Sequence, residues 1–206
     1  FLKSAVIVDC KRIEDAYIYK YIVSEVKNNG RNISDLAVRA LIEMTNGNMS
    51  SICCEISKLC AIYSKDETIN HLNVLEVVQK SVEYSIYELS DALSKRDGNA
   101  AISLIKNMLL SKEEPSMLLS LISSHFRRLL FVSISDISNE ELAMLLGVKE
   151  YAIKKAKENA KLFSVRKLKG VNELLENVDY MQKSGEMSSE NCLFYVVFNI
   201  IHEKDN

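Results

Sequence analysis

The sequence predicts an all-α protein, and two features of its composition support this fold class. Glycine and proline together account for seven of the 206 residues, whereas they make up roughly 12% of an average protein. Sandwiches and barrels of β-strands need turn residues roughly every 8–12 positions, and this chain cannot supply them. The apolar share of 48% and the charged share of 26% are those of an ordinary globular chain with a buried core.

A first block of four helices is predicted from end signals. The first helix covers about residues 14–29 and ends at Asn28-Asn29-Gly30, because glycine accepts the left-handed backbone that closes a helix. Ser34, Asn48 and Asn70 can each cap a following helix. Their short polar side chains accept hydrogen bonds from the free amides of the first turn.

A second helical block is predicted to begin at Ser85, which forms a capping box with Glu88. Asn99 is predicted to cap the next helix. Pro115 then opens a longer one, since proline suits the first helical turn. Four apolar or aromatic-ring residues share one face of that helix: Leu118, Ile122, His125 and Leu129.

The remaining helices of this block are predicted from the same kinds of capping signal. Ser138 and Glu141 form a second capping box, and the short helix that they begin ends at Gly147. Helices are then predicted over residues 150–163, 165–184 and 189–202. Residues 1–9 read instead as an apolar strand of the kind that is buried in a parallel sheet. We expect this strand to be the end of an α/β domain that precedes the two helical blocks.

The known motifs of catalysis and nucleotide binding are missing from the sequence. No Gly-Lys pair occurs, so no phosphate-binding loop of the GxxxxGK[ST] type is present. The three histidines lie far apart in the sequence, and His125 is predicted to be a half-buried imidazole beside Phe126. We therefore expect no catalytic residues, no cofactor and no metal. The chain has no apolar stretch of the ~20 residues that a membrane span needs.

The five cysteines form no CxxC pair, which argues against a zinc site. Cys53 and Cys60 are seven residues apart and would share one helix face, as small buried residues do. We predict free, buried thiols, which favours a reducing, cytoplasmic compartment.

Residues 141–155 combine the short helix that ends at Gly147 with the start of a second, basic helix. Residues 149–169 carry eight lysines and arginines and two glutamates. A helix, a glycine turn and a second helix with basic residues is the layout of a helix-turn-helix DNA-binding domain. Lys154, Lys157 and Lys161 are the candidate contacts to nucleic acid, through phosphates. The simpler reading is an amphipathic helix with a solvated basic face.

Several segments, taken in order, resemble the delta subunit of the bacterial DNA polymerase III clamp loader. In the first block these are Gly47-Asn48, Ile52, Glu55-Ile56, Lys58-Leu59 and Ile69-Asn70, which look like the signature of the family's lid domain. In the second block they include Tyr84 to Leu93, Glu113-Glu114-Pro115, Phe126 to Leu130, Leu146-Gly147-Val148 and Lys183-Ser184-Gly185, which look like its collar domain.

The resemblance implies a small helical AAA+-type lid domain followed by a helical collar domain, with a residual N-terminal strand. Residues 1–12 would end a truncated AAA+-like domain, 13–79 would form the lid, and 80–206 would form the collar. The collar would assemble with the other loader subunits, so that the complex can open and load the sliding clamp on DNA. Contact with the clamp would require the missing N-terminal domain, and DNA would be bound only indirectly, within the complex.

The resemblance also implies a subunit without activity of its own, part of the DNA-directed DNA polymerase holoenzyme, a nucleotidyltransferase. Phe126, Arg127 and Arg128 are the candidate subunit interface, because aromatic and arginine side chains are enriched at interface hot spots. The alternative is a helix-turn-helix DNA-binding regulator based on residues 141–155. A third interpretation is a helical interaction module, or the lid and collar of a sibling loader subunit.

Overall fold

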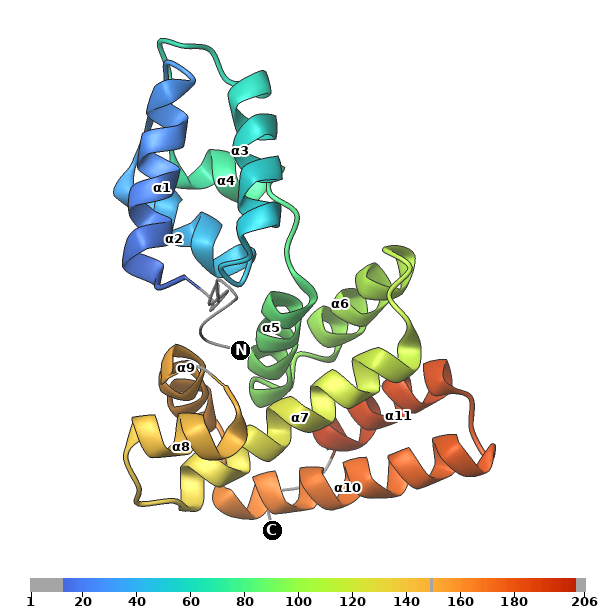
Figure 1. Cartoon of the computed structure of the whole chain (residues 1–206). Coiled ribbons are helices and arrows are strands. Elements are labelled where there is room, and N and C mark those ends of the chain that lie inside the picture. Colours follow the sequence, from blue (N-terminus) through green and yellow to red (C-terminus); the bar gives the residue numbers. More distant parts are fainter. Residues whose placement is uncertain (1–12, 149, 203–206) are drawn as a thin grey trace, which may run out of the picture. The chain divides into compact units, whose positions relative to one another are not determined.

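The computed structural model describes residues 13–148 and 150–202, and this part of the chain is almost entirely helical (Figure 1). Its described residues form eleven α-helices and two strands of two residues each. The all-α prediction is confirmed. The predicted strand over residues 1–9 lies outside the described residues. The chain divides into two compact units between Tyr84 and Ser85, and the domain boundary expected at 79/80 remains a prediction.

The first unit contains four helices and one short pair of strands. The helices are α1 (Asp15–Asn28), α2 (Asp35–Met44), α3 (Met49–Ile62) and α4 (His71–Val77). The strands β1 (Asn32–Ile33) and β2 (Thr68–Ile69) pair in parallel. Fully buried side chains from all these helices and from β2 form one core, which includes Ile18, Ile22, Leu41, Ile52, Leu59, Ile69 and Val74.

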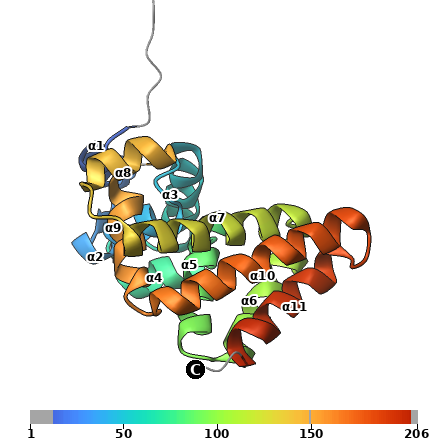
Figure 2. The ribbon, with the colours of Figure 1, turned by 90° about the horizontal axis from the view of Figure 1, so that it is seen from below.

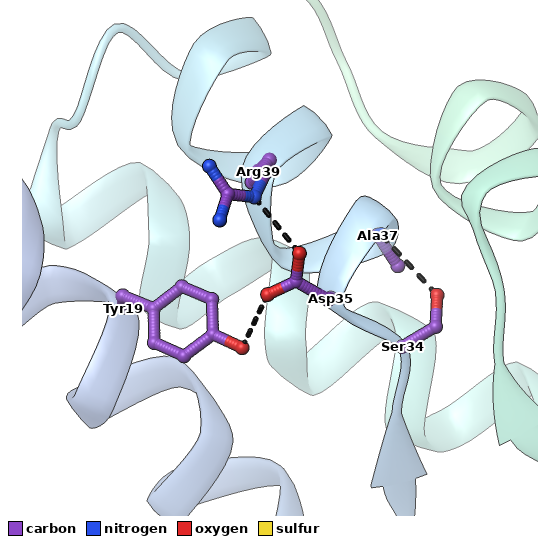
Figure 3. Close-up of polar contacts among 5 residues, drawn as sticks. All are labelled: Tyr19, Ser34, Asp35, Ala37 and Arg39. Atoms are coloured by element: carbon purple, nitrogen blue, oxygen red, sulfur yellow. Dashed lines mark hydrogen bonds and ion pairs between the residues drawn. The ribbon is translucent and has the colours of Figure 1, made fainter.

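Short polar contacts fix the start of α2 (Figure 3). The Ser34 hydroxyl oxygen accepts a hydrogen bond from the Ala37 amide at 3.3 Å. The Asp35 carboxylate accepts one from the Tyr19 hydroxyl at 2.7 Å and one from the Arg39 guanidinium at 2.9 Å. The Tyr19 bond, followed by the Arg39 bond, lowers the pKa of Asp35. All three caps predicted in this unit are confirmed: Ser34, Asn48 and Asn70.

The second unit is built around one long helix, α7 (Pro115–Ile134). The other helices are α5 (Val82–Ser94), α6 (Gly98–Leu110), α8 (Asn139–Leu146), α9 (Glu150–Ala160), α10 (Val165–Ser184) and α11 (Ser189–His202). Helices α9, α10 and α11 all pack against α7. Figures 1 and 2 both show α10 and α11 running beside it.

Two of the predicted helix starts in this unit are wrong. Helix α5 begins at Val82, where the Ser81 hydroxyl accepts a hydrogen bond from the Tyr84 amide at 3.2 Å, so Ser85 lies inside the helix. Helix α6 is capped by Asp97 and not by Asn99. In both places a rival capping residue stands two to four positions earlier. The Ser138–Glu141 capping box and the helix end at Gly147, with φ of 62°, are confirmed.

Helix α7 has the length and apolar composition to cross a membrane. Seven of its residues are buried, however, and it packs against three other helices of the same unit. A core helix has the same composition, because its apolar residues face its neighbours. The packing of α7 therefore accounts for its apolar character.

Candidate functional site

The three residues of the candidate interface follow one another in the middle of α7. Successive side chains of a helix point about 100° apart, so the three side chains leave the helix in different directions. Phe126 is 1% exposed, Arg127 is exposed and Arg128 is half-buried. The structure therefore separates residues that the sequence suggested would act together.

Phe126 belongs to the core of the second unit. Its ring packs edge-to-face against the imidazole of His125 and the ring of Phe163, with centroids 5.5 and 5.7 Å apart. The ring therefore offers almost no exposed surface, and its contact with another subunit stays a prediction that this burial disfavours. The reason is helix periodicity: Phe126 lies one turn after the buried Ile122 and shares its face.

His125 is a buried, neutral imidazole. The residue is 4% exposed, more deeply buried than predicted, and its ring also meets the ring of Tyr87 edge-to-face at 5.1 Å. Burial, with a smaller effect of the nearby Arg128 charge, lowers the pKa of His125 to about 3. Its Nε2 atom has no hydrogen-bond partner among the described residues. These surroundings suit a packing role and not an acid or base.

Tyr87 links three helices of the second unit and was missed by the sequence analysis. From α5 its ring contacts His125 of α7, and the Lys155 ammonium of α9 lies 4.7 Å from the ring centroid. Its hydroxyl oxygen lies 3.5 Å from Nη1 of Arg128. Arg128 is thereby engaged in holding α5 against α7. No local sequence pattern signals this cluster, because His125, Arg128 and Lys155 lie 38, 41 and 68 residues after Tyr87.

Arg127 lies in a polar groove between α7 and α10 that has a volume of about 290 Å³. Three serines of α7 line the groove with it, and Asn172, Glu176, Asp179 and Lys183 line it from α10. Asn172 donates hydrogen bonds to the backbone oxygens of Leu168, at 2.7 Å, and Phe126, at 3.3 Å. Asp179 pairs with Lys183 at 2.6 Å. Among the described residues, Arg127 forms no ion pair.

Two apolar side chains continue the exposed side of α7 beyond Arg127. Phe131 is 39% exposed and Ile134 is 55% exposed. The spacing from Arg127 is four and seven residues, which places the three side chains along one stripe of the helix. The sequence analysis missed this stripe, although its spacing was visible one turn beyond Arg127.

The predicted phosphate contacts differ from one another in their surroundings. Lys154 pairs with Glu150 at 2.8 Å, and this hydrogen bond raises the pKa of Lys154. Lys157 is half-buried and Lys161 is exposed. Neither has an ion pair or a side-chain hydrogen bond to another described residue.

The segment α8–Gly147–α9 has the helix–turn–helix connectivity that the sequence suggested. The apolar face of α9 is buried through Ile153, Ala156 and Ala160, and α9 packs against α7 and α8. A recognition helix presents its N-terminal residues to base edges. In α9 the first turn carries Glu150, and a carboxylate there repels DNA phosphates.

Comparisons with known proteins bear directly on the second unit. Residues 83–200 match the family model described as "DNA polymerase III delta subunit, C-terminal domain". This match covers more than half of the chain. The chain belongs to the DNA polymerase III delta subunit family. The helix-turn-helix alternative gains no support from these comparisons.

Two curated relatives are similar to this delta-family chain over most of its length. The DNA polymerase III subunit delta of Bacillus subtilis is 27% identical over 98% of the chain and 59% of the relative. The probable DNA polymerase III subunit delta of Aquifex aeolicus is 24% identical over 86% of the chain and 52% of the relative. The chain thus spans between half and three fifths of these relatives.

A solved structure gives the same result for the fold. The Bacillus subtilis DNA clamp loader delta protein matches with a TM-score of 0.77 and 27% identity, over 98% of this chain and 61% of the other. Its similarity extends to the first unit, which the family model does not reach.

The first unit of this delta-family chain carries the Gly47–Leu59 signature on α3 and the turn before it. Asn48 caps α3 by accepting a hydrogen bond from the Ser51 amide at 3.1 Å. Glu55 is 5% exposed and pairs with Lys58 at 2.7 Å, while its Oε2 atom has no hydrogen-bond partner among the described residues. The signature residues thus shape and pack a helix.

The described cysteines of this delta-family chain differ in burial. Cys60 and Cys192 are buried free thiols, as predicted, and burial raises the pKa of both. The prediction is wrong for Cys54, which is exposed, and for Cys53, which is half-exposed beside the Tyr21 hydroxyl at 3.2 Å. Within residues 13–148 and 150–202, no three potential ligands cluster to hold a metal.

Proposed function

We propose that this chain supplies the lid and collar of a delta subunit of the DNA polymerase III clamp loader. Its second unit acts as the collar and assembles with other loader subunits, so that the complex can open and load the sliding clamp on DNA. The observation that carries this proposal is the family match over residues 83–200, which spans nearly all of the second unit. The TM-score of 0.77 to a clamp loader delta protein supports it.

The outward side of α7 is the surface that we assign to subunit contact. Arg127, Phe131 and Ile134 lie on one exposed stripe, and the stripe borders the groove against α10. A planar guanidinium beside an aromatic and an aliphatic side chain is the composition of an interface hot spot. Arg127 has a free guanidinium that can pair with a carboxylate or helix-end carbonyl of the neighbour. In this proposal the aromatic side chain of the interface is that of Phe131, whereas the sequence indicated Phe126.

The role is one of assembly and requires no chemistry from this chain. We expect no intrinsic activity, only a part in the DNA-directed DNA polymerase holoenzyme, and we expect the protein in the cytoplasm. The apolar stripes and buried, neutral His125 fit a scaffold. We expect contact with the sliding clamp to be made by the family's N-terminal domain; the chain spans 59% of a curated relative.

The test is co-elution of the chain with the other loader subunits on gel filtration. The unmodified chain is expected to enter the complex, and Arg127→Glu is expected to weaken its entry at least tenfold. Lys27→Glu, an equal exchange of an exposed lysine for glutamate on α1, is the matched control and should enter normally. If the unmodified chain elutes apart from the loader subunits, the proposed function is wrong.

A further inference from the structure

The structure sorts the seven described basic residues of the segment 149–169 by what their side chains do; Lys149 lies outside the described residues. Three of them have a structural partner: Lys154 pairs with Glu150, Lys155 lies over the Tyr87 ring, and Lys167 donates to the Ile200 carbonyl at 2.9 Å. Four others have no ion pair or side-chain hydrogen bond to another described residue: Lys157, Lys161, Arg166 and Lys169. We call these four residues the basic corner.

The basic corner lies where α9 ends and α10 begins. Lys157 is three residues before the end of α9, and Lys169 is four residues after the start of α10. At about 1.5 Å of rise per helical residue, both lie within about 6 Å of the turn along their helix axes. Lys161, Arg166 and Lys169 are exposed and Lys157 is half-buried, so all four lie close to this turn along the chain and three of them are well exposed to solvent.

The nearest carboxylates in the sequence, Glu158 three residues before Lys161 and Glu173 four residues after Lys169, form no ion pair with a described residue. Elsewhere an exposed cation pairs with a carboxylate one turn earlier, as Lys95 does with Asp91 at 2.7 Å. None of the four has a carboxylate four residues before it, and for Lys161 that position is Lys157. The first turn of α10 contains no acidic residue, although cations are disfavoured at the positive end of a helix.

Four cations that have no ion pair among the described residues are available to an anionic partner outside the fold. Three of the four are lysines, whose compact ammonium groups serve well as point charges for phosphates. Lysine is depleted at protein–protein interfaces, which argues against an acidic protein surface. Contacts to phosphates position a protein on DNA without reading its sequence, and we expect contact with the backbone alone.

We propose that the basic corner binds the phosphate backbone of duplex DNA without reading its sequence. The choice of DNA over other polyanions rests on the proposed function, which places this chain in a complex that acts on DNA. The structure also refines the sequence-based set of contacts: Lys154 leaves it, and Arg166 and Lys169 join Lys157 and Lys161.

The test is binding of the whole chain to a fluorescently labelled duplex of mixed sequence, followed by anisotropy between about 50 and 200 mM salt. With four phosphates neutralised, the slope of log K against log salt is expected near −3.6, at about −0.9 per phosphate. Replacing all four corner residues by Gln should weaken binding at least tenfold at the lowest salt and reduce the slope by about 3. Thermal unfolding of the variant should match that of the unmodified chain.

The matched control replaces four exposed lysines that are scattered over both units: Lys27, Lys65, Lys106 and Lys112→Gln. It removes the same total charge, so equal weakening by both variants would overturn the proposal. Absence of binding by the unmodified chain at about 50 mM salt would also overturn it. Tighter binding to phosphatidylserine vesicles than to DNA would overturn it as well. It would also be overturned if the corner variant kept its DNA affinity but no longer co-eluted with the loader subunits. Failure of the unmodified chain to co-elute would instead count against the proposed function alone.

Discussion

The two sides of α7 show how one helix serves both folding and assembly. Its inner side carries His125 and Phe126, which are 4% and 1% exposed and stack on each other edge-to-face. Its outer side carries Arg127, Phe131 and Ile134, all exposed. Aromatic rings are present on both sides, Phe126 on the inner side and Phe131 on the outer side. Position on the helix decides which of them stabilise the unit and which are available to a partner.

The largest expected effect is that of Phe126→Ala on the inner side. Removing a buried phenylalanine leaves a cavity and costs about 3–5 kcal/mol, so the second unit should lose much of its stability. Native-state amide exchange in α7 measures this free energy. The matched change on the outer side is Phe131→Ala, which should cost only about 1–2 kcal/mol because its ring is partly solvated already. Equal losses in both variants would contradict the division of α7 into two sides.

The next effect is a pH dependence that comes from His125. Its pKa is about 3 in the folded unit and about 6.5 in an unfolded chain. Between these values the unfolded chain binds the extra proton, so stability falls as the pH falls below about 6.5. The loss should be about 2 kcal/mol between pH 7 and pH 5.

The same exchange measurement, repeated over this pH range, tests the role of His125. His125→Phe should flatten the profile by that amount, because the ring that must stay neutral is gone. His71→Gln, a change at an exposed histidine of the first unit, should leave the profile of the second unit unchanged. A profile that stays steep in His125→Phe would assign the pH dependence to other groups.

The inner side of α7 could be predicted from the sequence, while its partners could not. Periodicity placed Leu118, Ile122, His125 and Leu129 on one face, and all four are buried. The same periodicity places Phe126 one turn after Ile122, on the buried face. The aromatic and arginine composition of residues 126–128 nevertheless favoured an interface. Contacts such as Tyr87 with Lys155 join residues far apart in sequence. Helix ends were predicted well where a single capping residue was available, and less well where Ser81 or Asp97 competed with a later residue.

A smaller effect is expected for Arg128, which lies between the two sides. Its guanidinium is half-buried and lies 3.5 Å from the Tyr87 hydroxyl. Arg128→Met keeps the aliphatic packing but removes the charge and the contact, so the second unit should lose about 1 kcal/mol. The pKa of His125 should also rise toward its ordinary value, since the Arg128 charge helps to lower it. NMR titration of the imidazole measures this; an unchanged pKa would show that burial alone lowers it.

The smallest effect on stability is expected for Arg127→Ala, on the outer side of α7. Its side chain is exposed and has no ion pair among the described residues, so the free energy of unfolding should change by less than about 0.5 kcal/mol. If the outer side of α7 binds a neighbouring subunit, the same variant should nevertheless enter the loader complex at least tenfold less readily. Arg128→Met should show the opposite pattern, with lower stability and near-normal assembly. A residue that affects assembly but not folding, one position away from a residue that affects folding but not assembly, would establish that the direction of the side chain on α7 sets its role.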